Sequence, residues 1–281
     1  MADYRIITDS SCELPQEYAG DNRFEHVPFR VEVDGVPMRD SKDINTKSLL
    51  EKIVNSKTFA SFDCPSPDVF YYYIATSDAK RVYIITISSK ISGCYVSAML
   101  AKKLYEDAHK DKEIFVIDSR SASGGESQLA LLAMELEEQG LTFEEIKKQL
   151  TNRRDKLRTI VLYDNISALY KNVKFSKIKD AIKSAANFKS FFMGDSELED
   201  KCFKDICLKQ NLTQLADSIA NALKGASKQT RVIITHCNNL VGAEKLRDML
   251  MEKTGLSNFV IMSTSGSSSM IACEGGMVVT F

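Results

Sequence analysis

Short apolar runs rich in β-branched residues alternate with helical patterns through the first half of the chain, and this alternation limits the fold most. Runs at 4–8, 81–87 and 113–118 predict buried strands. Helical spacing predicts helices at 45–54, 68–75, 92–106, 123–138 and 142–154. Apolar strands separated by helices predict an α/β fold with a mainly parallel sheet and helices on both faces.

The second half contains fewer regular strands, and the chain of 281 residues is long enough for two domains. We therefore expect an N-terminal α/β domain at 1–157 and a C-terminal mixed α/β domain at 158–281. In the second domain we expect strands at 159–163, 190–193, 231–236, 258–262 and 277–281, and helices at 212–223 and 241–253.

Composition excludes several classes of protein. Lys plus Arg number 37 against 38 Asp plus Glu, so the chain lacks the basic surplus of a nucleic-acid-binding protein. No apolar run approaches the roughly 18 residues of a membrane span, and the N-terminus enters a strand without a signal sequence. Seven cysteines without a C-x-x-C pair indicate reduced thiols and no zinc. We expect a cytoplasmic protein without integral membrane insertion.

Small hydroxyl side chains follow each of the first three predicted strands. The segments read TDSSCELP at 8–15, TISSKISGCY at 86–95 and IDSRSASGGES at 117–127. Ligands of open α/β sheets bind beyond the carboxyl ends of the strands, and glycines let backbone amides approach a ligand closely. Together these segments predict a binding crevice at this edge of the sheet.

Ser92 lies at a plausible helix N-cap, with Gly93 and Cys94 in the first turn. Unpaired amides and the helix dipole favour a negative charge at such a position. Serine is also a preferred capping and turn residue, so the same pattern fits a purely structural role. Both interpretations of these serines stay open at this stage.

Catalytic motifs are missing from the sequence. There is no G-x-G-x-x-G, P-loop, H-E-x-x-H or G-x-S-x-G motif. Of three histidines only His236 ends a predicted strand, and a lone strand-end histidine is more often structural. A binding protein without metal or cofactor is therefore favoured over an enzyme.

Six segments, taken in order, resemble the DegV family of bacterial fatty-acid-binding proteins. TDSSCELP resembles the family's first strand end, and ISSKISGCYVSA at 87–98 resembles its S-S-x-x-S-G-T-Y-x-S-A motif. The other matching segments are VPFRVEVDG with RD at 27–40, CPSPDVF at 64–70, VIDSRSASGGES at 116–127 and THCNNLVGAEKL at 235–246.

The resemblance implies a two-domain DegV-like fold that holds one long-chain fatty acid in an apolar tunnel between the domains. It also implies that the carboxylate meets hydroxyl groups near the S-G motif and is presented to a fatty acid kinase partner. The candidate lipid-binding residues are Ser10, Phe62, Asp63, Ser92, Gly93, Cys94, Ser123, Gly124 and Cys273.

Some of these positions depart from the family pattern. Phe62-Asp63-Cys64 replaces the usual T-S-Q, Cys94 replaces a threonine, and Cys273 replaces a histidine near the C-terminus. An ionised Asp63 beside a carboxylate would repel it. A sensor of a different amphiphile is therefore one alternative. A second is an acyl-ester or thioester hydrolase that uses Ser92 or Cys94 with His236.

Overall fold

The structure is a computed structural model that describes residues 3–58, 60–164, 190–193 and 212–281. Its first sheet contains four parallel strands in the order β2-β1-β6-β7. These are β1 (Tyr4–Asp9), β2 (Phe24–Val27), β6 (Arg81–Thr86) and β7 (Glu113–Asp118). The predicted parallel sheet is confirmed, and β2 is an additional edge strand without a predicted counterpart.

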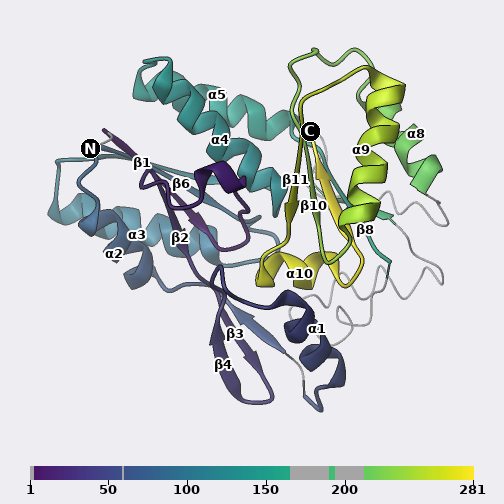
Figure 1. Ribbon diagram of the computed structural model, residues 1–281. Helices are drawn as coiled ribbons and strands as arrows, with labels where there is room; N and C mark the ends of the chain where they lie inside the picture. The colour runs from purple at the N-terminus through teal and green to yellow at the C-terminus, as the bar shows by residue number, and fades with distance from the viewer. Residues whose placement is uncertain (1–2, 59, 165–189, 194–211) are drawn as a thin grey trace.

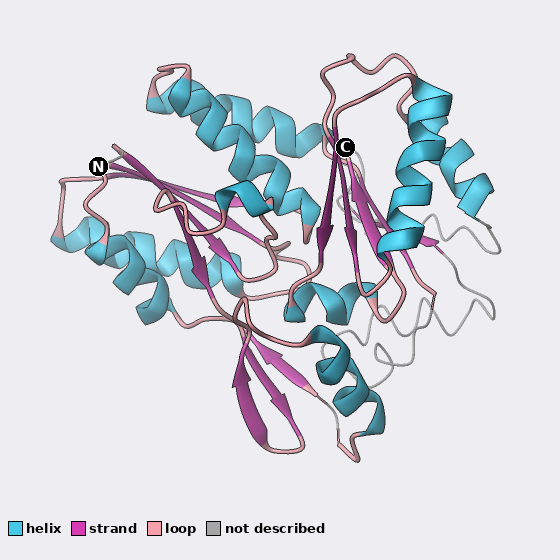
Figure 2. Cartoon of the chain, viewed as in Figure 1, coloured by secondary structure: helices cyan, strands magenta, loops and turns pink. Residues whose placement is uncertain are grey.

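Helices cover both faces of this sheet (Figures 1 and 2). Val82 and Ile84 point to one face and pack with α2 and α3, whereas Tyr83 and Ile85 point to the other and pack with α4 and α5. Successive strand residues face opposite sides, so a strand buried on both faces is apolar throughout. The helices are α2 (Pro67–Thr76), α3 (Cys94–Ala108), α4 (Gly124–Glu138) and α5 (Phe143–Lys156).

A second, antiparallel sheet has the order β4-β3-β5 and projects from the first beside α1 (Thr46–Asn55) (Figure 1). Its strands are β3 (Arg30–Val33), β4 (Val36–Arg39) and β5 (Ser61–Asp63). Asp34 and Gly35 both have positive φ, 51° and 77°, as a two-residue hairpin turn of type I′ requires. The Asp-Gly pair between valines is the signal that would have predicted this hairpin.

The third sheet is mixed, with the order β11-β10-β12-β8-β9. Strands β10 and β11 are parallel and the other pairs antiparallel. Its elements are β8 (Thr159–Leu162), β9 (Ser190–Met193), β10 (Val232–His236), β11 (Phe259–Ser263), β12 (Met277–Thr280), α8 (Leu212–Ala222), α9 (Leu240–Thr254) and α10 (Gly266–Ala272). The predicted mixed α/β second half is confirmed, with α10 as an additional helix.

Helix α4 lies between the first and third sheets. Eleven of its fifteen residues are buried, as expected for a helix packed between two sheets. A Cβ atom at Gly124 would come within 2.8 Å of the Ile233 side chain in β10, so this close approach requires glycine. The predicted boundary after residue 157 falls at the end of α5, and the division into domains stays a prediction.

Candidate functional site

A cavity of about 460 Å³ opens beyond the carboxyl end of β6. This is the position that the parallel topology favours for a ligand. Its walls come from the loop between β6 and α3, from the antiparallel sheet and from α10. The lining residues are Phe29, Phe62, Cys64, Ile87, Ser89, Lys90, Ile91, Ser92, Gly93, Val96, Ser267, Met270 and Ile271.

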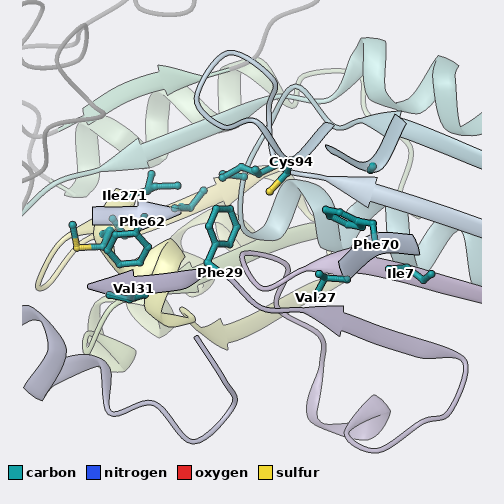
Figure 3. Close-up of a cluster of buried hydrophobic side chains, with 14 of the residues drawn as sticks. Ile7, Val27, Phe29, Val31, Phe62, Phe70, Cys94 and Ile271 are labelled. Atoms are coloured by element: carbon teal, nitrogen blue, oxygen red, sulfur yellow. The ribbon is translucent and has the colours of Figure 1, made fainter. Parts of the chain in front are cut away.

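The lining combines buried apolar side chains with exposed polar ones. Phe29, Phe62 and Ile271 are buried and belong to one large hydrophobic cluster, which Figure 3 shows together with Cys94. Ser89 and Lys90 are exposed, so this polar part of the lining faces solvent. Lys90 is the charged member of this lining among the residues that the structure describes. Such a cavity is suited to an amphiphile with an anionic or polar headgroup.

The loop between β6 and α3 is held by carboxylates at neighbouring strand ends. Asp9 Oδ2 accepts a hydrogen bond from the Ile87 amide at 2.8 Å, and Asp118 Oδ1 accepts one from the Ser89 amide at 3.0 Å. Gly93, not Ser92, is the N-cap of α3, although the Ser92 hydroxyl accepts a bond from the Cys94 amide at 3.3 Å. The rim of the cavity is therefore fixed before a ligand enters.

Three predicted site residues line the cavity: Phe62, Ser92 and Gly93. Cys94 is fully buried next to it, and the Ser92 hydroxyl donates to its Sγ at 3.4 Å. Asp63 is not part of the lining. Its carboxylate accepts from the Ser61 hydroxyl at 3.4 Å, on the face of β5 opposite to Phe62. The repulsion between Asp63 and an anionic ligand that the sequence suggested therefore has no basis in this geometry.

The remaining predicted site residues lie outside the lining. Ser10 Oγ donates to Asp40 at 2.8 Å, and Ser123 Oγ donates to Glu13 at 2.6 Å. Gly124 packs against β10, and Cys273 is buried at the end of α10. The two serine hydroxyls thus contact buried carboxyl groups of the protein itself. A ligand contact for these four residues stays a prediction that the cavity does not support.

The carboxyl groups of Asp40 and Glu13 hold α10 in place. Asp40 accepts hydrogen bonds from the amides of Gly266 at 3.0 Å and Ser267 at 2.9 Å. Glu13 accepts one from the Ser265 amide at 2.8 Å. The first amides of a helix have no partner within the helix, so these contacts satisfy them from distant parts of the chain. The carboxyls of Asp40 and Glu13 thereby position the wall of the cavity that α10 provides.

Burial raises the pKa of both carboxyls. The pKa of Glu13 rises from 4.5 to about 7 because the group is removed from water, although hydrogen bonds from serine residues partly offset this. Burial also raises the pKa of Asp40, against the hydrogen bonds of Ser267 and Ser10. Near Glu13, burial likewise raises the pKa of Asp9 and of Glu126. This carboxyl cluster therefore makes the stability of the protein depend on pH.

Replacing Glu13 by glutamine is expected to remove part of that dependence. A pKa raised from 4.5 to about 7 means that the folded state holds the proton more tightly than the unfolded state. The stabilisation by this group is complete below about pH 4.5 and is lost as the pH rises through about 7. Between pH 5 and 8 the wild type should lose up to about 3 kcal/mol relative to Glu13→Gln. Urea unfolding of both proteins measures this, and a difference independent of pH would contradict it.

His236 lies apart from the proposed nucleophiles. Its Nδ1 accepts a hydrogen bond from the Asn239 amide at 3.2 Å, at the start of α9. Within the described part of the chain, no hydrogen bond joins it to Ser92 or Cys94, and it does not line the cavity. Burial also raises the pKa of the Cys94 thiol, which disfavours the thiolate. The geometry gives no support to a hydrolase.

Several lining residues were missed from the sequence, including Lys90, Cys64, Ser267, Met270 and Ile271. The signal for α10 was the hydroxyl-rich segment STSGSSS at 263–269, which follows a predicted strand as the other three segments do.

Among the described residues, no cluster of His, Cys, Asp and Glu could hold a metal ion. None of the described helices combines the length and apolar composition needed to cross a membrane.

The fold and the cavity are those of an α/β protein with an amphiphilic binding site. The chain belongs to the DegV family: the family model, described as "Uncharacterised protein, DegV family", matches residues 3–279. A DegV domain-containing protein of Streptococcus gordonii is 30% identical over 284 residues, which cover 99% of this chain and 98% of that protein. The resemblance noted in the sequence is thereby confirmed.

Two solved structures extend the comparison. A DegV family protein from Ruminococcus gnavus, solved with vaccenic acid, has a TM-score of 0.86 and 29% identity, covering 99% of both chains. The Fatty Acid Kinase (Fak) B3 protein of Streptococcus pneumoniae, loaded with linoleic acid, has a TM-score of 0.84 and 26% identity, covering 99% of this chain and 98% of that one.

Proposed function

We propose that this protein binds one long-chain fatty acid in the cavity and presents its carboxylate to a fatty acid kinase partner. The observation that carries the proposal is the cavity itself, with an apolar interior and a rim formed by Ser89, Lys90 and Ser92. The relatives from Ruminococcus gnavus and Streptococcus pneumoniae, which hold fatty acids, support it. The protein performs no chemistry and needs no cofactor.

The exposed position of the cavity rim supports the proposed contact with a kinase. Ser89 and Lys90 are exposed, so a carboxylate bound beside them stays within reach of a second protein. Because α10 supplies one wall and the loop before α3 another, the ligand lies between a domain at 1–157 and a domain at 158–281. The protein acts in the cytoplasm, where a kinase has access to its phosphoryl donor.

Equilibrium binding tests the proposal. The protein is stripped of lipid by solvent extraction and titrated with hexadecanoic acid and with hexadecanol, and native mass spectrometry counts the bound molecules. We expect one fatty acid per chain and weaker binding of the alcohol. Failure to bind the acid would refute the proposal, and tighter binding of the alcohol would favour the alternative of a different amphiphile.

Replacing Ser92 by alanine is expected to weaken fatty acid binding by about tenfold, since a hydrogen bond to a charged group contributes about 1.5 kcal/mol or more. Its hydroxyl lies at the rim, where it would turn from the weak acceptor Cys94 Sγ to the carboxylate, and it has no equivalent in alanine. Ser97→Ala, in the helix α3 that follows Ser92 and outside the lining, is the matched control and should bind like the wild type. Equal affinities of the wild type and Ser92→Ala would place the carboxylate elsewhere.

A further inference from the structure

Two cysteine thiols meet in the wall of the cavity. Cys64 follows β5, and Cys94 is the first residue of α3. The Cys94 side chain is hydrogen-bonded to Cys64, and both are reduced thiols. Cys64 Sγ also lies against Gly93, where an added Cβ atom would be only 3.0 Å from the sulfur. The two side chains therefore lie next to each other although the residues are far apart in sequence.

The two thiols differ in their access to solvent. Cys64 is half-buried and lines the open cavity, so a small polar oxidant can reach it. Cys94 is fully buried and interacts with both Cys64 and the Ser92 hydroxyl. Cys12, Cys237 and Cys273 are also buried, and none of them lines the cavity. Oxidation of the described thiols should therefore begin at Cys64.

We propose that Cys64 and Cys94 are a site of reversible oxidation, at which a peroxide converts the thiol pair into a disulfide. The Cys64 thiolate attacks one peroxide oxygen, so that an S–O bond forms, the O–O bond breaks and the departing hydroxide takes a proton. The Cys94 sulfur then attacks the Cys64 sulfenic acid, an S–S bond forms, and the oxygen leaves as water with the Cys94 proton. With hydrogen peroxide, two thiols and one peroxide give one disulfide and two waters.

Local geometry favours the second step. A disulfide needs the two sulfurs about 2 Å apart, so the neighbouring side chains have to rotate toward each other. The disulfide ties the connection between β5 and α2 to the first turn of α3, across one wall of the cavity. Intracellular disulfides of this kind are typically transient and respond to oxidants.

Peptide mapping after oxidation tests this proposal. The full chain with Cys202 and Cys207 replaced by serine, two positions outside the described residues, is treated with hydrogen peroxide, blocked with an alkylating reagent and digested. We expect a peptide that links Cys64 to Cys94 and disappears after reduction. Its absence from protein whose other thiols have been oxidised would overturn the proposal, as would a preferred link between another pair.

Single variants distinguish the thiol that is oxidised first, Cys64, from the thiol that then forms the disulfide, Cys94. In Cys94→Ser the sulfenic acid at Cys64 should persist and react with dimedone, whereas in Cys64→Ser residue 94 should stay unmodified at the same peroxide concentration. Cys237→Ser, which removes a buried thiol elsewhere, should still form the link. Dimedone labelling of Cys94 before Cys64 would contradict the proposed order. If one of these variants does not fold, peptide mapping of the chain in which only Cys202 and Cys207 are replaced still detects or excludes the Cys64–Cys94 disulfide.

Discussion

Replacing Asp40 by alanine should lower the free energy of unfolding by about 3 to 5 kcal/mol and weaken fatty acid binding at least about tenfold. The Asp40 carboxylate accepts from the Ser10 hydroxyl and from the amides of Gly266 and Ser267. All three donors lie in buried surroundings, and alanine leaves each of them without an acceptor. Chemical denaturation measures the stability, and titration of the surviving folded protein measures the binding.

The binding defect follows because α10 carries part of the cavity wall. Ser267, Met270 and Ile271 line the cavity, and their position depends on how the first turn of α10 is anchored. Asp40→Asn keeps one acceptor oxygen and should show about half of the loss in stability. Asp43→Ala is the matched control, since Asp43 is exposed on the same connection. If Asp40→Ala changed stability by less than about 1 kcal/mol, the anchoring of α10 would have to be explained otherwise.

Most strands of the first and third sheets could be predicted because burial on both faces leaves a continuous apolar run in the sequence, whereas the edge strand β2, with two partly exposed polar residues, shows no such run. The antiparallel sheet could not be found in this way. Strand β4 is largely exposed and contains Pro37, and β5 has only three residues, so neither shows a clear periodicity. Only the Asp34-Gly35 turn carries a strong local signal.

For the candidate site residues, the sequence could not predict which serines contact a ligand. Ser10, Ser92 and Ser123 all follow predicted strands, and their local sequences do not distinguish a ligand contact from a structural one. The difference arises from long-range partners: Asp40 lies 30 residues from Ser10, and Glu13 lies 110 residues from Ser123. Ser92 has no such buried carboxyl partner in the described structure and remains at the cavity rim.

Helix α10, which forms one wall of the cavity, was not predicted because it too depends on partners far away in the sequence. Helix α10 has seven residues and begins with a glycine and three serines, which are poor helix formers. Propensity alone would not place a helix there. The carboxyls of Asp40 and Glu13 compensate by accepting hydrogen bonds from the amides at its start. The element thus forms because of tertiary contacts, and a local pattern cannot reveal it.

Most of the affinity for a fatty acid should come from its chain. Phe29, Phe62, Ile87, Met270 and Ile271 supply an apolar lining, and burying a methylene group contributes about 0.8 kcal/mol. The rim adds only a few polar contacts, one of them with an exposed lysine, and exposed ion pairs contribute about 1 kcal/mol or less. The contribution of the chain should therefore grow with its length until the cavity of about 460 Å³ is filled.

Shortening the ligand from hexadecanoic to dodecanoic acid should thus cost about 3 kcal/mol, or about 200-fold in Kd, because four buried methylene groups are lost. Titration of delipidated protein with saturated acids of 10 to about 18 carbons measures the increment per methylene. In Ser92→Ala every acid of the series should weaken by the same factor, because the headgroup and the chain contact separate parts of the cavity. An affinity that varied less than about threefold over the series would mean that the chain does not enter the apolar cavity, whatever the headgroup contacts.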